Sequence, residues 1–200
     1  APNLLATLSR YHGKVSGFRQ AIDDGISSNL LLEPAFQRGF AMLSEFGYTF
    51  DLVLEPNHLD YALQLAHAFP SQKFVINHLA KPTYTTEEFA SWSKGIEALA
   101  KCGNAYCKLS GLITQIDYQP GNEEELEIDQ FVPFLDKALE AFGAHRLMFG
   151  SDWPVCTQAA TYDEVYDIIS TYSEKLSSSE QAFIMGNTAA EFYQIGMPTT

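Results

Sequence analysis

The sequence predicts an α/β protein built on a parallel sheet. Short apolar runs rich in β-branched and aromatic residues alternate with longer runs of helical periodicity. The strand candidates begin about 33 residues apart on average, an ordinary length for one strand–helix unit. Strands separated by helices pair in parallel through right-handed crossovers, so the alternation predicts the topology as well as the class.

Five segments are expected to form the strands of this sheet. Each is a short apolar run that ends at polar or glycine residues. They are Lys14–Arg19, Thr49–Leu54, Lys73–His78, Ala105–Ser110 and Arg146–Gly150.

Helices are expected between these strands and after the last one. The segments between strands are Glu33–Phe46, Asn57–Phe69, Phe89–Lys101 and Glu123–Phe142, the third opened by a capping box at Thr85 and Glu88. Pro133 should kink or split the fourth segment. Thr161 and Ser177, each followed three residues later by glutamate, predict capping boxes that open two more helices. Gly186 and Asn187 should break the last pattern before a short final helix.

Two architectures satisfy this pattern of elements. Five units can form an open doubly wound sheet. Alternatively, a (β/α)8 barrel, or TIM barrel, needs about 260 residues, so this 200-residue chain would supply its last five units as one domain, residues 1–200. Periodicity does not choose between the two.

Composition excludes several functional classes. With 25 acidic and 12 basic residues the net charge is −13, a surface that repels nucleic acid and anionic membranes. No apolar run approaches the roughly 18 residues of a membrane span, and no basic segment followed by an apolar one indicates a secretory signal. Cys102, Cys107 and Cys156 do not form a zinc pattern, and we interpret them as reduced structural thiols of a cytoplasmic protein.

Functional groups gather at the carboxyl ends of parallel strands in both architectures. In this chain those ends carry an arginine, two histidines, two lysines, an aspartate and a tryptophan. The residues are Arg19, His58, His78, Lys81, Lys108, Asp152 and Trp153.

Asp152 and His78 are the candidate catalytic residues. Asp152 follows an apolar strand and precedes Trp153, so its carboxylate should be partly desolvated and able to take a proton from water or to bind a metal. Its purely structural alternative is a turn or helix cap. His78 could act as a metal ligand, a general acid or a donor to an oxyanion, or could simply satisfy backbone carbonyls.

The remaining candidates would bind substrate. The planar fork of Arg19 suits a carboxylate or sugar hydroxyl, although a salt bridge is the alternative. Lys108 should point into a barrel interior, where it needs a carboxylate partner, and Asp152 is the partner we expect. His58 could be only a neighbour of a helix cap, and Lys81 a surface residue that reaches an anionic substrate. His12, His67 and His145 should be solvated.

Six segments of the chain resemble a known family. They are VSGFRQ (15–20), FDLVLEPNH (50–58), FVINHLAKP (74–82), AYCKLSGL (105–112), RLMFGSDWPV (146–155) and GNTAAEFY (186–193). In this order they are similar to the amidohydrolase-related family of the amidohydrolase superfamily, in its sugar-lactonase branch. The resemblance covers essentially the whole chain.

The resemblance implies a (β/α)8 barrel in which the five strands are the fourth to eighth. It implies that Asp152 is the acid/base group, that His78 binds or polarises the substrate carbonyl, and that Arg19 and Lys108 line the pocket. His58 matches a variable position. Superfamily members often use a divalent ion such as zinc or manganese, whereas this branch can act without one. The family's first-strand H-x-H pair is absent here, which leaves Asp152 and His78 as candidate metal ligands.

The leading hypothesis is a hydrolase that opens a cyclic ester, a sugar-acid lactone, as its small-molecule substrate. One alternative is a metal-dependent amidohydrolase or decarboxylase on the same barrel. Another is an inactive barrel fragment that acts as a binding or assembly module. Since five strands would leave open sheet edges, we expect the chain to be part of a longer enzyme or to associate with another copy. All catalytic readings require Asp152 and His78 to share one cavity.

Overall fold

The fold is centred on a sheet of five parallel strands. The computed structural model describes residues 2–22, 29–116 and 128–196. The strands are β1 (Gly17–Ala21), β2 (Thr49–Val53), β3 (Phe74–Ile76), β4 (Ala105–Leu109) and β5 (Leu147–Phe149). Each lies within or overlaps a predicted segment, and the largest shift is at β1, which starts three residues later than predicted.

The strand order decides between the two predicted architectures. The strands are arranged β1-β2-β3-β4-β5, the same as their order in the chain. A doubly wound sheet reverses its order at a switch point, and this sheet does not. Sequential order with helical crossovers is the arrangement found in a TIM barrel. The doubly wound alternative is therefore wrong.

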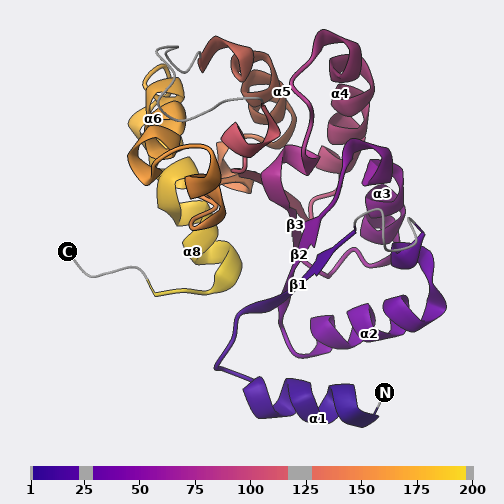
Figure 1. Cartoon of the computed structure of the whole chain (residues 1–200). Helices are drawn as coiled ribbons and strands as arrows, with labels where there is room; N and C mark the ends of the chain where they lie inside the picture. Colours follow the sequence, from indigo (N-terminus) through magenta and orange to yellow (C-terminus); the bar gives the residue numbers. More distant parts are fainter. Residues whose placement is uncertain (1, 23–28, 117–127, 197–200) are drawn as a thin grey trace.

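The helices lie mainly on one face of this sheet. They are α1 (Pro2–Tyr11), α2 (Pro34–Glu45), α3 (Leu59–Ala68), α4 (Thr86–Ala100), α5 (Val132–Phe142), α6 (Tyr162–Ser173), α7 (Ser178–Ala182) and α8 (Thr188–Tyr193). Figure 1 shows α2, α3 and α4 on one side of the strands and α8 on the other. We call the side that α8 covers the inner face and the opposite side the outer face.

Local sequence signals explain most of the helix starts. The capping boxes at Thr161 and Ser177 are both formed and open α6 and α7. Thr85 caps α4 by accepting the N–H of Glu88, but the Glu88 carboxylate binds Thr83 instead of closing the predicted box. Helix α1 was not predicted.

The expectations about helix breaks are confirmed in part. Pro133 does not kink a helix but lies in the first turn of α5, where its missing N–H would have no intrahelical partner. The predicted segment is nevertheless split ahead of Pro133, because a 3-10 turn, Ile128–Gln130, precedes α5 as a separate element. Residues 123–127 of the predicted helix lie outside the described residues. Gly186 and Asn187 do not interrupt the final pattern, because Phe183–Asn187 forms a π-helical turn that runs directly into α8.

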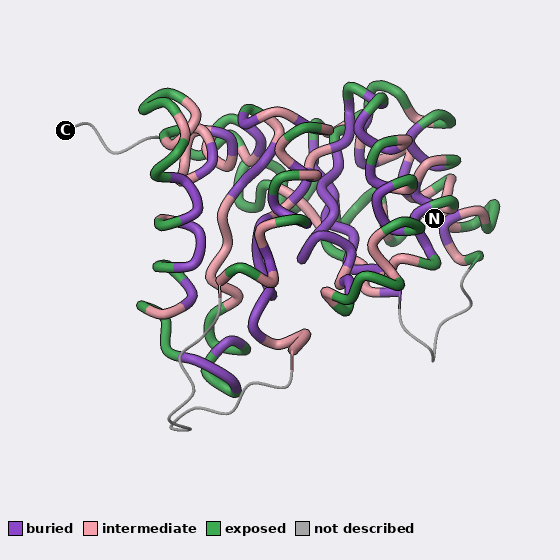
Figure 2. Tube along the Cα trace, turned by 90° about the horizontal axis from the view of Figure 1, so that it is seen from above, coloured by how far each residue is buried: buried purple, intermediate pink, exposed green. Residues whose placement is uncertain are grey.

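The apolar core is divided by the sheet. Its larger part fills the space between the strands and the outer helices, with Phe40, Leu65, Trp92 and Leu135 among its members. A smaller cluster of Val75, Met148 and Phe192 lies on the inner face, under α8. Figure 2 shows the strands buried and the helices exposed along their outward sides.

The cysteines and three of the histidines lie as expected. Cys102, Cys107 and Cys156 are buried free thiols, which agrees with a structural role. His12, His67 and His145 are exposed. None of the described helices combines the length and apolar character needed to cross a bilayer.

Candidate active site

His78 is carried by a left-handed turn that directly follows β3. Four consecutive non-glycine residues, from His78 to Lys81, have φ values of 57°, 54°, 62° and 51°. Such residues cost roughly 1–2 kcal/mol each, so the surrounding structure must hold the turn in place. The indole of the buried Trp92 does so, since its Nε1 donates to the Leu79 carbonyl oxygen at 2.7 Å.

The end of β4 packs directly against the His78 ring. The Ser110 hydroxyl is 2.9 Å from Nδ1 of His78. Gly111 follows with φ +63°, and a Cβ built there would lie 2.6 Å from the same nitrogen. The glycine therefore permits both the backbone conformation and the close approach of the imidazole.

Asp152 meets His78 at the carboxyl edge of the sheet. Asp152 follows β5 with φ 57°, and its carbonyl oxygen accepts the N–H of Cys156 at 3.0 Å. Its Oδ1 lies 3.8 Å from Nε2 of His78, and the side chains are 16% and 9% exposed. This separation is too long for a direct hydrogen bond, and it leaves a position where one substrate atom can contact both groups. The predicted juxtaposition is confirmed.

Burial and nearby cations keep His78 neutral. Burial lowers the pKa of His78 from 6.5 to about 4, against the opposing attraction of Asp152. The charges of Arg19, Lys108 and Lys81 are smaller contributions to this lowered pKa. A neutral imidazole with Nδ1 engaged by a hydroxyl can present its other nitrogen to a substrate as a hydrogen-bond donor.

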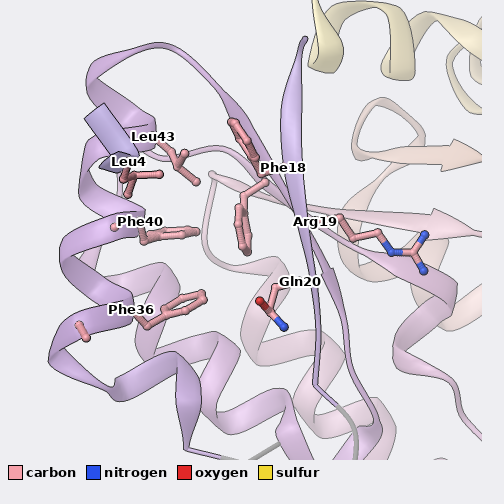
Figure 3. A pocket seen from close by; sticks show the side chains of 10 residues that line it. Leu4, Phe18, Arg19, Gln20, Phe36, Phe40 and Leu43 are labelled. Atoms are coloured by element: carbon pink, nitrogen blue, oxygen red, sulfur yellow. The ribbon is translucent and has the colours of Figure 1, made fainter. Parts of the chain in front are cut away.

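Three of the predicted binding residues surround this pair. Arg19 is exposed, and Figure 3 shows its side chain on the opposite side of β1 from Phe18 and Phe36. Lys81 ends the left-handed turn, and its N–H donates to the His78 carbonyl oxygen at 2.6 Å. Trp153 follows Asp152 and is 66% exposed.

A separate hollow lies on the outer face behind Arg19. Its volume is about 290 Å³, and Phe18, Phe36 and Phe40 line it from β1 and α2 (Figure 3). His78 and Asp152 are not among its lining residues. This apolar hollow is therefore separate from the His78–Asp152 pair, although Arg19 also borders it.

Lys108 is on the inner face, as predicted, but with another partner. Its Nζ lies 2.5 Å from Oδ2 of Asp51, so the expected pairing with Asp152 is wrong. Asp51 also accepts the Tyr193 hydroxyl. Neither Asp51 nor Tyr193 was predicted as a site residue from the sequence. An aspartate within a strand whose five residues are all buried was the available signal for Asp51, because a buried carboxylate requires a partner.

His58 has a local structural partner. Its Nδ1 accepts the N–H of Glu55 at 3.3 Å, within a capping box ahead of α3, and the residue is only 4% exposed. In the described parts of the chain, no recorded contact joins His58 to His78 or Asp152. Its role as a substrate-binding residue stays a prediction without support from a contact.

The donor set does not fit a closed metal site. Within the described ranges, no group of three His, Cys, Asp or Glu side chains is placed to hold an ion. His78 and Asp152 are the two predicted ligands, and a structural or catalytic zinc needs at least three protein ligands. The three cations around His78 would also repel a divalent ion.

The fold and these contacts define a class of protein. A buried histidine and a partly buried carboxylate lie side by side at the carboxyl edge of a barrel-type parallel sheet, which is the arrangement of groups that acid/base chemistry requires. A family model described as amidohydrolase matches residues 5–195. The chain belongs to the amidohydrolase family.

Characterised relatives are similar over most of this chain. An L-fucono-1,5-lactonase from Burkholderia multivorans is 34% identical over 206 aligned positions, which cover 99% of this chain and 69% of that protein. An L-rhamnono-gamma-lactonase from Scheffersomyces stipitis is 28% identical, with 74% of this chain and 48% of that protein covered. A crystal structure of a Burkholderia multivorans amidohydrolase with bound zinc superposes with a TM-score of 0.90 at 33% identity, covering 98% of this chain and 70% of that one.

Proposed function

We propose that this protein hydrolyses a small cyclic ester, a sugar-acid lactone. The observation that carries the proposal is the 3.8 Å approach of the Asp152 carboxylate to the neutral His78 ring at the carboxyl edge of the sheet. The similarity to two sugar lactonases supports the substrate class. A cation-lined site in a chain of net charge −13 suits a reaction that develops negative charge and releases a carboxylate.

In the proposed reaction Asp152 is the general base and then the general acid. Its carboxylate takes a proton from a water molecule as the water oxygen attacks the lactone carbonyl. The carbon–oxygen bond of the ring then breaks, and Asp152 returns the proton to the departing hydroxyl oxygen. The products are one hydroxyl group and one carboxylic acid, which loses its own proton to solvent.

His78 and Lys108 would stabilise the oxyanion of the tetrahedral intermediate. The Ser110 hydroxyl, in this proposal, donates to Nδ1 of His78, which leaves the hydrogen on Nε2. That N–H and the Lys108 ammonium supply donors where negative charge develops. Arg19 and Lys81 would orient the polar groups of the sugar, and Trp153 would contact its apolar face. No step is derived through a metal ion, and measurement of the metal content of the active protein tests this choice.

The direct test is a panel of aldonolactones followed with a pH indicator. We expect hydrolysis by the wild-type protein and a decrease in kcat of about 100- to 10,000-fold in Asp152→Asn. Asp136→Asn, an exposed aspartate on α5, is the matched control and should leave kcat unchanged. Failure of the wild type to open any lactone, or an Asp152→Asn variant as active as the wild type, would overturn the proposal.

We also propose that the five strands correspond to strands four to eight of a (β/α)8 barrel. Their sequential order supports this assignment. Strands β1 and β5 are the edges of the described sheet, and each needs a partner for its outer backbone groups. Further strands or a second copy of the chain would provide one, and native mass spectrometry distinguishes a monomer from a self-associated form.

A further inference from the structure

A tyrosine, an aspartate and a lysine form one connected group on the inner face of the sheet. This inner triad consists of Asp51, Lys108 and Tyr193. The Lys108 Nζ is 2.5 Å from Oδ2 of Asp51, and the Tyr193 hydroxyl donates to both Asp51 oxygens, at 2.8 and 2.9 Å. The ammonium also lies 5.3 Å from the centre of the Tyr193 ring. The Asp51 carboxylate therefore connects Lys108 to α8.

The register of the sheet explains how these side chains meet. Asp51 on β2 is aligned with Val75 on β3, and Val75 with Tyr106 on β4. Lys108 lies two residues beyond Tyr106, so it is on the same face but nearer the carboxyl edge. Its side chain reaches Asp51 across the intervening strand β3. The lysine thus links the interior of the sheet to the edge where His78 and Asp152 lie.

The ammonium of Lys108 retains hydrogen-bonding capacity. A lysine has three N–H donors, and among the described residues Asp51 is the one acceptor recorded for Lys108. The lysine side chain is 20% exposed, so a small molecule can reach it, whereas the Asp51 side chain is 12% exposed. The charge of Lys108 already acts on His78. One N–H of the Lys108 ammonium is therefore bound to Asp51, and the other two can donate to a substrate.

We propose that Asp51 and Tyr193 are positioning residues that hold the Lys108 ammonium in place for the oxyanion. This inference rests on the proposed lactone hydrolysis and adds two residues to its machinery, one of them from the C-terminal helix α8. Asp51 fixes the lysine through its carboxylate, and Tyr193 fixes the carboxylate. Neither residue touches the substrate, so both act through Lys108.

A double-mutant cycle tests this dependence. Lys108→Met should lower kcat by about 100-fold, the usual cost of one oxyanion donor. Asp51→Asn should lower kcat by about 10-fold and Tyr193→Phe by about 5-fold, with KM changed less than twofold, because the interaction is made in the transition state. In the Lys108→Met background both substitutions should change kcat less than twofold, since their effect passes through the lysine.

A matched group elsewhere in the molecule supplies the controls. Asp136→Asn and Tyr172→Phe change an aspartate on α5 and a tyrosine on α6 that contact each other and Lys175, and they should leave kcat unchanged. Because Asp51→Asn could unfold the protein, kcat is normalised to the folded fraction, and Tyr193→Phe provides the milder variant. Effects of Asp51→Asn and Tyr193→Phe that are equally large with and without Lys108 would overturn the inference.

A second measurement separates this inference from the proposed function. In an ¹H–¹⁵N NMR spectrum, a restrained Lys108 ammonium should exchange its protons slowly enough to give a signal. Lys108→Met should remove that signal and so assign it, and Asp51→Asn and Tyr193→Phe should broaden it. If wild type opens no lactone but these changes occur, the proposed reaction fails while the positioning stands. A signal unaffected by Asp51→Asn and Tyr193→Phe would overturn the positioning.

Discussion

The molecule contains the same three side chains in two different settings. The outer triad consists of Asp136, Lys175 and Tyr172. Its Lys175 Nζ is 2.6 Å from Oδ1 of Asp136, the Tyr172 hydroxyl donates to that oxygen at 2.9 Å, and the ammonium lies 4.3 Å from the tyrosine ring centre. The inner triad has nearly the same bond lengths. The lengths of the hydrogen bonds and ion pairs therefore do not distinguish the two groups.

Their surroundings do distinguish them. The lysine and aspartate side chains of the outer triad are 48% and 51% exposed, against 20% and 12% in the inner triad. Solvent replaces the partners of the exposed Lys175 and Asp136 at little cost, although Tyr172 itself is buried. In the inner triad each charge depends on its neighbour, because water reaches it poorly. The contacts of the inner triad should therefore contribute more to the free energy of unfolding than the same contacts of the outer triad. Through Lys108 they should also affect catalysis.

Removal of the aspartate should expose the largest difference between the triads. Asp51→Ala leaves the Lys108 ammonium and the Tyr193 hydroxyl without their acceptor, and we expect the free energy of unfolding to fall by about 3 to 4 kcal/mol. Asp136→Ala should lower it by less than about 1 kcal/mol. Urea denaturation at pH 7 measures both. Equal losses from the two substitutions would show that burial does not separate the triads.

His78, which lies beside the cations of the inner face, should make the stability of the protein depend on pH. The cations of the inner site, Arg19, Lys81 and Lys108, face His78, and burial together with these charges lowers its pKa to about 4 despite Asp152. In the unfolded chain a histidine has a pKa of about 6.5. Between these values the unfolded chain binds more protons than the folded one, so the free energy of unfolding falls as the pH falls.

The expected loss from His78 between pH 6.5 and pH 4 is on the order of 2 to 3 kcal/mol, with no further contribution above pH 6.5. Urea titrations at several pH values of the wild type, His78→Gln and the exposed control His145→Gln measure it. The His78 variant should have the flatter profile over this window, and the control should follow the wild type. A His78→Gln profile parallel to the wild type would contradict the assignment.

The His78–Asp152 pair was predictable from the sequence, whereas the inner triad was not. His78 and Asp152 each follow an apolar strand, and parallel strands bring their carboxyl ends to one edge, so local pattern and topology sufficed. Tyr193 and Asp51 are 142 residues apart in the chain, and no local pattern indicates their contact. Lys108 was correctly placed on the inner face, but its partner depends on which strands are aligned.

Backbone conformation was less predictable than topology. The parallel sheet followed from the alternation of strands and helices, although its strand order did not, whereas the left-handed turn from His78 to Lys81 contains no glycine that would signal it. Trp92, which comes from the following helix, stabilises that turn. The sequence left open whether Pro133 kinks a helix or splits it, because a proline in a first turn and one in a helix interior look alike in the sequence. A tertiary contact, the bond from Trp92, holds the left-handed turn.

Salt should produce the smallest difference between the triads. The coupling free energy between Asp136 and Lys175, measured by a double-mutant cycle of stability, should be about 0.5 kcal/mol at low ionic strength. It should largely disappear in 1 M NaCl, where the Debye length is about 3 Å. The coupling between Asp51 and Lys108 should persist, because ions approach a buried pair poorly and screen it less. Potassium chloride in place of sodium chloride controls for ion-specific effects. If both couplings decrease by the same fraction, solvent reaches the inner triad as freely as the outer one. Burial would then not distinguish the two triads.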